Sequence, residues 1–185
     1  MIIYEPMLPK DVLSLDLANL DAKSENFTFS YYMGYLLNHP CDFFTVRSFF
    51  PFLSQHTSMI FTNPILGYAF GRKELKEKLC YHLSAISVAP SARELGIGTK
   101  LMRLFECTGN SYEAWFIDLF VRESNKLAIS FYKRLGYVVY RTIFDYYMYP
   151  RENAFDMRLS LDKDSNKELL KSGEDVNVEN LKEYY

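Results

Sequence analysis

SVAPSARELGIGTKLM, residues 87–102, places two glycines, Gly96 and Gly98, where the surrounding pattern predicts the first turn of a helix. A glycine inside a helix is less stable than an alanine by about 1 kcal/mol, so this position needs something that only glycine provides. Glycine tolerates a positive φ and lets a ligand approach the backbone closely. The apolar segment before Pro90 is typical of a strand, so the stretch predicts a strand, a loop and a helix.

Two common phosphate-binding motifs do not match these glycines. A P-loop needs a hydroxyl residue after its lysine, but Leu101 follows Lys100, and the dinucleotide motif needs a third glycine where Leu101 stands. The remaining pattern is R-x-x-G-x-G, from Arg93 to Gly98. It suits a pyrophosphate resting on the free N–H groups of a helix N-terminus. A loop that only needs a positive φ is the alternative.

The composition predicts one domain. A chain of 185 residues, 49% hydrophobic and 17% aromatic, can bury a large core. A net charge of −2 gives no argument for nucleic acid or membrane binding, and no apolar run is long enough to span a bilayer. The cysteines lack metal-ligand spacing, which predicts mostly packed, reduced thiols, no metal and a cytoplasmic protein; they are Cys41, Cys80 and Cys107.

Interspersed strand and helix patterns predict an α/β or α+β fold with a mixed sheet. The expected strands are 1–7, 41–50, 65–74, 79–89, 115–122 and 137–149. The expected helices are 27–40, 97–107, 125–135 and one that starts at Pro9 and carries Val12, Leu13, Leu15, Leu17 and Leu20. The domain is expected to span 1–161, followed over 162–185 by a charged helix or a disordered tail.

A second motif, SNKLAISFYKRLGY, covers 124–137. Helical spacing predicts a core stripe of Leu127, Phe131 and Leu135. Asn125 and Tyr132 fall on a neighbouring face, where an amide and a phenol could flank a ligand. The alternative is that Asn125 caps the helix and Tyr132 is a packed aromatic residue.

These motifs together resemble the GNAT acetyltransferases: Val-Ala-Pro before R-x-x-G-x-G, then DLFVR over 118–122, then the motif over 124–137. Three further stretches resemble the catalytic subunits of N-terminal acetyltransferase B, within the protein N-terminal acetyltransferase branch. They are NLDAKSENF (19–27), YRTIFDYYM (140–148) and NAFDMRLSLDKD (153–164). The resemblance covers about residues 1–165, with 47–64 as a loop insertion.

The resemblance implies a mostly antiparallel sheet with two splayed parallel strands, 79–89 and 115–122, and acetyl-CoA bound with its thioester between them. It implies no metal. The implied cofactor-binding residues are Ile86, Val88, Arg93, Leu95, Gly96, Ile97, Gly98, Thr99, Asn125 and Tyr132. Glu94 departs from the frequent double arginine of the family and places a carboxylate near phosphates.

Three catalytic residues follow from the same resemblance. Tyr132 would donate a hydrogen bond or proton to the departing CoA sulfur, and Asn125 would hold the amide arm of the cofactor or a water. His82 would act as a base, as a hydrogen-bond donor to the substrate, or as both. About a tenth of a protein α-amine is already neutral at pH 7, so a weak base suffices. Residues 79–81 lack the Trp-His pair that related enzymes tend to have before this histidine.

The B-type resemblance implies a substrate N-terminus of Met followed by Asp, Glu, Asn or Gln. The implied substrate-binding residues are Glu25, Phe27, His82, Ser84, Tyr146 and Tyr147. Phe27 stands where a tyrosine is common, which removes one hydroxyl donor.

The implied partners are a large auxiliary subunit and nascent N-termini at the ribosome. The leucines after Pro9 are more than one packed face needs, so they form either a docking face for that subunit or part of a core. A GNAT enzyme for other N-termini, lysine or small amines is one alternative function. A non-catalytic acyl-CoA-binding module is the other.

Overall fold

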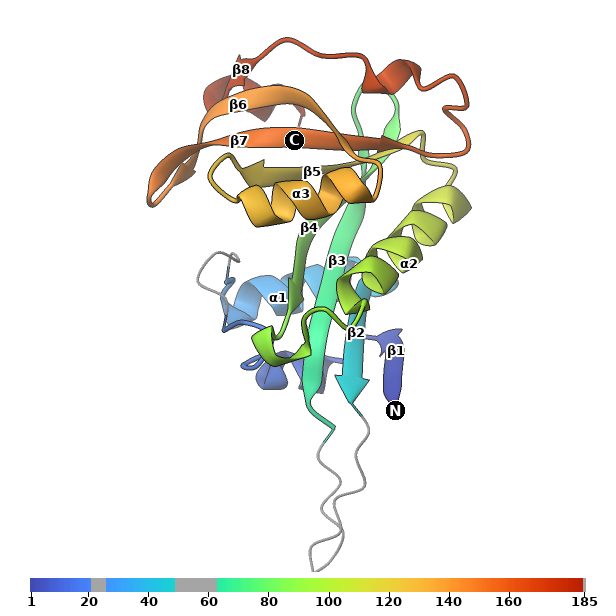
Figure 1. The fold of residues 1–185 in the computed structure, drawn as a ribbon, viewed down its shortest axis with the longest axis vertical. Coiled ribbons are helices and arrows are strands. Elements are labelled where there is room, and N and C mark those ends of the chain that lie inside the picture. Colours follow the sequence, from blue (N-terminus) through green and yellow to red (C-terminus); the bar gives the residue numbers. More distant parts are fainter. Residues whose placement is uncertain (21–25, 49–62, 185) are drawn as a thin grey trace, which may run out of the picture. The chain divides into compact units, whose positions relative to one another are not determined.

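The computed structural model describes residues 1–20, 26–48 and 63–184. Its strands form a sheet in the order β1-β2-β3-β4-β5-β7-β6-β8, with helices flanking it (Figure 1). The expected mixed sheet is confirmed, because β4–β5 and β6–β8 pair in parallel, whereas β1–β2, β2–β3, β5–β7 and β6–β7 pair antiparallel.

The chain divides into two compact units. The first unit comprises Met1–Gly71 and Ala85–Phe105, and the second comprises Arg72–Ser84 and Glu106–Tyr185. Strands β3 and β4 and helix α2 contribute residues to both, and the units are described in turn. The boundary of a single domain at residue 161 stays a prediction.

The first unit contains three antiparallel strands: β1 (Ile2–Pro6), β2 (Phe43–Ser48) and the start of β3 (Ile65–Leu75). Helix α1 (Phe29–Asn38) confirms the helix expected over 27–40. It begins after Thr28, whose hydroxyl accepts a hydrogen bond from the Tyr31 amide at 3.3 Å.

The helix expected from Pro9 is shorter and tighter than the prediction. It is the 3-10 helix η1 (Pro9–Ser14). Val12 of η1 and Leu15, the residue directly after it, are buried and lie three residues apart, which matches three residues per turn. Asp11 is buried beside them and pairs with Arg47 of β2 at 2.6 Å. Leu13, Leu17 and Leu20 of the same region are 72%, 43% and 66% exposed, so these three do not belong to the core.

Aromatic side chains dominate the core of the first unit. Tyr32 and Tyr68 bring their hydroxyl oxygens within 3.0 Å, and the Tyr68 hydroxyl donates to Asn19 Oδ1 at 2.7 Å, so the buried phenols are satisfied. Part of the high aromatic content of the chain therefore packs in this core. The buried members are Met7, Val12, Leu15, Ala18, Tyr32, Tyr35, Leu36, Phe43, Ile65, Tyr68 and Phe70.

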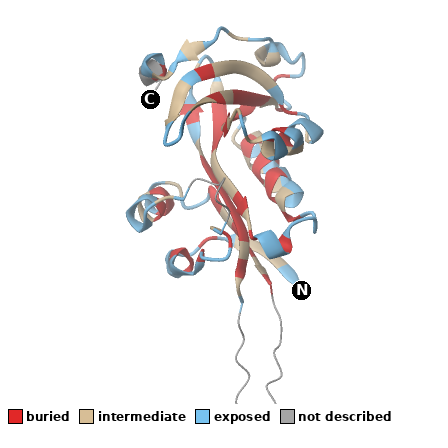
Figure 2. Ribbon diagram, turned by 60° about the vertical axis from the view of Figure 1, so that its left-hand side comes forward, coloured by how far each residue is buried: buried red, intermediate tan, exposed pale blue. Residues whose placement is uncertain are grey.

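The second unit is built around β5 (Phe116–Arg122), whose first four residues are all buried, as expected of a central strand. β4 (Leu79–Val88) lies parallel to β5 on one side, and β7 (Arg151–Ser160) lies antiparallel on the other. Figure 2 shows how buried residues concentrate in these strands. β6 (Val138–Met148) was expected as the last strand, but β7 follows it in the chain and separates it from β5.

Two longer helices complete the units. α2 (Ile97–Ser111) starts where the glycine motif predicts and extends four residues past the expected end. α3 (Lys126–Arg134) lies alongside β5 and β7 in Figure 1. Gly136 follows it with φ of 99°, which supplies the expected stop.

The structure describes the C-terminal segment, expected over 162–185 as a charged helix or a disordered tail, up to residue 184. This segment forms η3 (Glu168–Leu170), β8 (Val176–Asn177) and η4 (Val178–Tyr184). β8 pairs with β6, and Leu181 is only 4% exposed in the small core that it shares with Ile143 and Ala154. A few apolar residues therefore suffice to hold a strongly charged segment on the sheet.

Candidate active site

The glycine loop joins β4 to α2 through the 3-10 turn η2 (Pro90–Ala92). Glu94 and Gly96 both have positive φ, 64° and 74°. A Cβ on Gly96 would meet no atom within 4 Å, so this glycine is required for its backbone conformation and not for space. The positive φ that the sequence predicts for a glycine of this loop is confirmed at Gly96.

The surface of this loop is nevertheless suited to an anion. Ile97 is buried and anchors the start of α2, while Arg93, Leu95 and Thr99 are exposed and Gly98 is half-buried. The first amides of a helix have no partner within it, and its dipole favours negative charge. Arg93 Nε donates to the Val88 carbonyl at 3.3 Å, which holds the guanidinium at the loop.

A close backbone contact fixes the strand that leads to this loop. A Cβ on Gly67 of β3 would lie 2.7 Å from the Ser87 carbonyl oxygen. The Ala89 amide donates to the Leu66 carbonyl at 2.7 Å. Ile86 and Val88 are half-buried on the same strand.

Helix α3 carries Asn125 and Tyr132. Asn125 Oδ1 accepts a hydrogen bond from the Ala128 amide at 3.2 Å, so Asn125 is the N-cap. Tyr132 is 7% exposed and its ring lies beside Tyr137, with centroids 5.8 Å apart. Burial raises the pKa of Tyr132, so the phenol is protonated at neutral pH. Its hydroxyl makes no hydrogen bond to any described residue.

The predicted core stripe of α3 is wrong at Leu127, which is 71% exposed. The buried residues are Ile129 and Tyr132, one helical turn apart. The buried face of α3 is therefore the one that carries Ile129 and Tyr132, and not the predicted face that carries Leu127.

His82 of β4 meets a buried carboxylate on β5. His82 Nδ1 lies 3.0 Å from Oδ1 of Asp118, and the two residues are register partners in the parallel pairing. The other oxygen of Asp118 accepts a hydrogen bond from the Lys76 ammonium. Burial alone would raise the pKa of Asp118, but Lys76 and His82 hold it well below its usual range.

Phe120 contacts His82, and two tyrosines of β6 continue the cluster from Phe120. The Phe120 ring is 5.1 Å from the His82 ring and 5.0 Å from that of Tyr146, and Tyr146 contacts Tyr147 at 4.9 Å. The register of β6 shifts before Tyr147, where Asp145 has φ of 57°. We call Phe120, Tyr146 and Tyr147 the aromatic group. Through Phe120, three predicted site residues of the second unit come together: His82, Tyr146 and Tyr147.

The parallel strands separate next to this group. Pairing of β4 with β5 ends at Leu83 and Leu119, although both strands continue. Half-buried Ser84 comes directly after the last pair, so the predicted splay is confirmed.

The remaining residues predicted to bind the substrate, Phe27 and Glu25, are only partly described. Phe27 stacks on Tyr31 with ring centroids 4.4 Å apart and lies 5.9 Å from Phe70, so it belongs to the aromatic core of the first unit. Glu25 and most of the expected 47–64 insertion lie outside the described residues.

Comparison with known proteins identifies the family. The model of the acetyltransferase (GNAT) family matches residues 20–137. The chain is 41% identical over 176 residues to the N-terminal acetyltransferase B complex catalytic subunit naa20 of Schizosaccharomyces pombe, covering 93% of this chain and 90% of that protein. This chain belongs to the GNAT acetyltransferase family.

Solved structures agree with this assignment of the GNAT domain. Chaetomium thermophilum Naa20 in complex with a bisubstrate analogue is similar, with a TM-score of 0.79, 30% identity and coverage of 95% and 96% of the two chains. A NatB acetyltransferase complex bound to a bisubstrate inhibitor contains a chain with a TM-score of 0.77, 26% identity and coverage of 97% and 98%. The predicted family, branch and N-terminal acetyltransferase activity are confirmed.

The motifs of this GNAT chain did not predict three residues of the site, Asp118, Lys76 and Phe120. DLFVR carries a signal for Asp118 alone, because an aspartate in an otherwise apolar central strand must find a buried partner. Lys76 follows β3 at a turn, and no pattern marks it.

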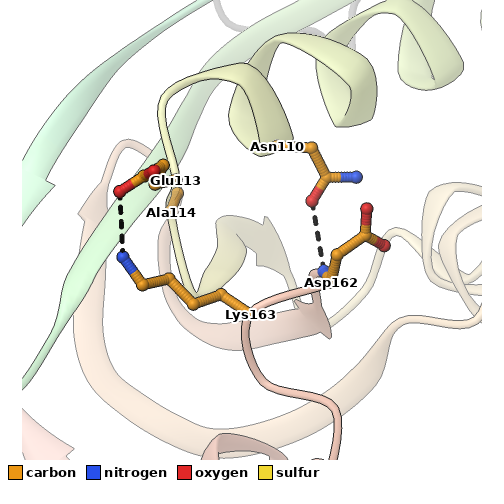
Figure 3. A pocket seen from close by; sticks show the side chains of 5 residues that line it. All are labelled: Asn110, Glu113, Ala114, Asp162 and Lys163. Carbon is orange, nitrogen blue, oxygen red and sulfur yellow. Dashed lines mark hydrogen bonds and ion pairs between the residues drawn. The ribbon is translucent and has the colours of Figure 1, made fainter.

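A pocket of about 360 Å³ lies away from these residues, at the end of α2 (Figure 3). Asn110 Oδ1 accepts from the Asp162 amide at 3.1 Å, and Lys163 pairs with Glu113 at 3.2 Å across it. These contacts join the C-terminal segment to α2. Among the described residues, no group of three or more His, Cys, Asp or Glu side chains could hold a metal ion.

Proposed function

We propose that this GNAT enzyme acetylates the α-amine of N-termini that begin Met-Asp, Met-Glu, Met-Asn or Met-Gln, as the catalytic subunit of a B-type complex. The observation that supports it most is the gathering of His82, Tyr146 and Tyr147 around Phe120. These residues are the ones that the B-type resemblance assigns to the substrate.

In this proposal the glycine loop holds the pyrophosphate of acetyl-CoA. The backbone from Leu95 to Thr99 offers N–H groups, and Arg93 adds a positive charge. Ile86 and Val88 would bind the pantetheine amides through their backbone. Glu94 is exposed, so its carboxylate can point into water, but it weakens the positive potential of the loop.

The reaction is attack of a neutral amine on the thioester carbonyl carbon. Positioning supplies most of the rate, because an α-amine is already partly neutral near pH 7. Tyr132 would donate a hydrogen bond to the sulfur as the C–S bond breaks. Its hydroxyl has no hydrogen-bond partner among the described residues and is protonated, as this role requires. Asn125 already uses Oδ1 as the helix cap, which leaves its amide group for the cofactor or a water.

The first two residues of the substrate would be recognised differently. The methionine side chain suits the aromatic rings beside Phe27, since sulfur packs well against ring edges. The second side chain needs hydrogen-bond donors, and Tyr146 and Tyr147 supply hydroxyls. Ser84 and Glu25 complete the proposed set.

We further propose that the exposed leucines after Pro9, Leu13, Leu17 and Leu20, bind a large auxiliary subunit. Three exposed leucines within eight residues are typical of an interface. The subunit would place the enzyme at nascent chains on cytoplasmic ribosomes. No helix of the described residues is both long and apolar enough to span a bilayer.

Acetyl transfer to a peptide panel tests this proposal. The panel contains N-termini Met-Asp, Met-Glu, Met-Leu and Ser-Glu and one internal lysine, each assayed with and without the co-purified large subunit. We expect the highest kcat/KM with Met-Asp and Met-Glu. Activity on other amines only would retain the cofactor assignment and reject the substrate assignment.

A further inference from the structure

Asp118 lies where an ionised carboxylate is energetically unfavourable unless it is paired. It is 0% exposed in a central strand, and a buried charge costs several kcal/mol unless it is paired. Both of its oxygens are used, one by His82 Nδ1 and the other by Lys76. The carboxylate is therefore held from two sides and cannot turn away from the imidazole.

The charged side chains around Asp118 balance when His82 is neutral. One run of ion pairs leads from Asp118 to Lys76, Glu74 and Arg72. A second links Glu77, in the turn after β3, to Arg158 and Asp156 of β7 and Arg141 of β6. Together they are four cations and four anions. Burial and the charge of Asp118 raise the pKa of Asp156 to about 6, so it is mainly ionised at pH 7.5. Burial raises the pKa of Cys80, which stays a neutral thiol.

This balance decides the protonation state of the imidazole. Lys76 already neutralises Asp118, so an imidazolium would leave one uncompensated buried charge. A neutral His82 satisfies Asp118 by donating Nδ1–H to it, which leaves the lone pair on Nε2. Nε2 makes no hydrogen bond to any described residue, and its ring contacts Phe120 of the aromatic group.

We propose that Asp118, fixed by Lys76, is a positioning residue that holds His82 in the Nδ1–H tautomer, so that Nε2 accepts a proton from the substrate amine. This inference rests on the proposed function, in which His82 faces the acceptor. The α-ammonium loses one proton to Nε2, directly or through a water. The nitrogen lone pair then forms the C–N bond, the C–S bond breaks, and the second amine proton ends on the CoA sulfur.

The first test is the tautomer itself. The full chain is labelled with ¹⁵N-histidine, and the His82→Gln variant identifies the His82 signals among the three histidines. At pH 7.5 we expect a protonated Nδ1 and an unprotonated Nε2. An Nε2–H tautomer or an imidazolium would overturn the inference, and this measurement needs no variant of Asp118 and no substrate.

The second test is Asp118→Asn. Its oxygen is expected to stay with Lys76, so its NH₂ group faces Nδ1 and drives the proton to Nε2. We expect kcat/KM at pH 7 to fall about tenfold, because only about a tenth of an α-amine is neutral there without help. The deficit should shrink at pH 9, where the amine is mostly neutral. A purely structural role would give a deficit that does not depend on pH.

Asp11→Asn is the matched control, a buried aspartate that pairs with Arg47 and belongs to neither run of ion pairs around Asp118. It should leave the His82 tautomer and the pH profile unchanged. An Asp118→Asn variant with the wild-type tautomer and rate would refute the proposal. If the variant slows transfer to other N-termini but Met-Asp is not preferred, the substrate assignment fails and the positioning role stands.

Discussion

Replacing Tyr132 with phenylalanine removes one oxygen and keeps the ring. The ring contacts to Phe131 and Tyr137, at 5.3 and 5.8 Å between centroids, remain in the variant. The hydroxyl has no hydrogen-bond partner among the described residues, so its loss leaves no orphaned group. We expect the free energy of unfolding at pH 7 to change by less than about 0.5 kcal/mol.

The effect on catalysis should be much larger than the effect on stability. A hydrogen bond to a charged group contributes about 1.5–3 kcal/mol. If that bond forms only as the thiolate develops, kcat falls about 10- to 150-fold while acetyl-CoA affinity stays the same. Single-turnover acetyl transfer gives the rate of the chemical step, and calorimetry gives the dissociation constant.

The raised pKa of Tyr132 adds a test of its environment. A phenol whose pKa is higher folded than unfolded stabilises the native state below the unfolded value, about pH 10. That stability is lost as the pH rises further. The wild-type protein should therefore lose stability relative to Tyr132→Phe only above pH 10. Equal losses of rate and cofactor affinity, or an unchanged rate, would refute the role at the sulfur.

Three other outcomes follow from the structure. Glu94→Gly should stabilise the protein by about 1 kcal/mol, since a side chain at φ of 64° is strained, and it should also tighten acetyl-CoA binding. Glu94→Gln should tighten binding without stabilising the protein; melting curves measure the stability and calorimetry measures the binding. Gly173→Ala places a methyl 2.4 Å from the Tyr140 ring and should lower the free energy of unfolding, measured in urea, by about 1–3 kcal/mol. Gly34→Ala in α1 is the control: its methyl meets no atom within 4 Å, so it should not destabilise the protein. A thiol reagent should modify Cys41 and Cys107 quickly in the native protein and Cys80 only after unfolding, because burial raises the pKa of the Cys80 thiol; three fast thiols would contradict its burial.

The sequence predicts local features of this GNAT fold better than distant ones. The glycine loop, the apolar run of β5 and the stop at Gly136 depend on neighbouring residues, so they can be predicted from short patterns. The strand β7 was missed because NAFDMRLS alternates weakly and carries Asp156 and Arg158. Those two charges are tolerated because Asp156 pairs with Arg141 of β6 and Arg158 pairs with Glu77 in the turn between β3 and β4.

The candidate site shows the same limit. Tyr132 and His82 were found through motifs, but Lys76 is 42 residues from Asp118 in the chain, and only the folded sheet brings them together.

The cysteines were expected to be mostly packed, yet Cys41 and Cys107 are exposed. A small apolar residue gives no periodic signal of its own, so its burial depends on the face that the surrounding element presents.

The positions of these thiols have a practical consequence. Cys41 belongs to the first compact unit and Cys107 to the second, while Cys80 is shielded. The natural chain therefore carries one attachment point for a spin label on each unit. Pulsed electron resonance on the doubly labelled protein would give the distance distribution between them. Adding acetyl-CoA, then a peptide, would reveal whether each ligand narrows that distribution.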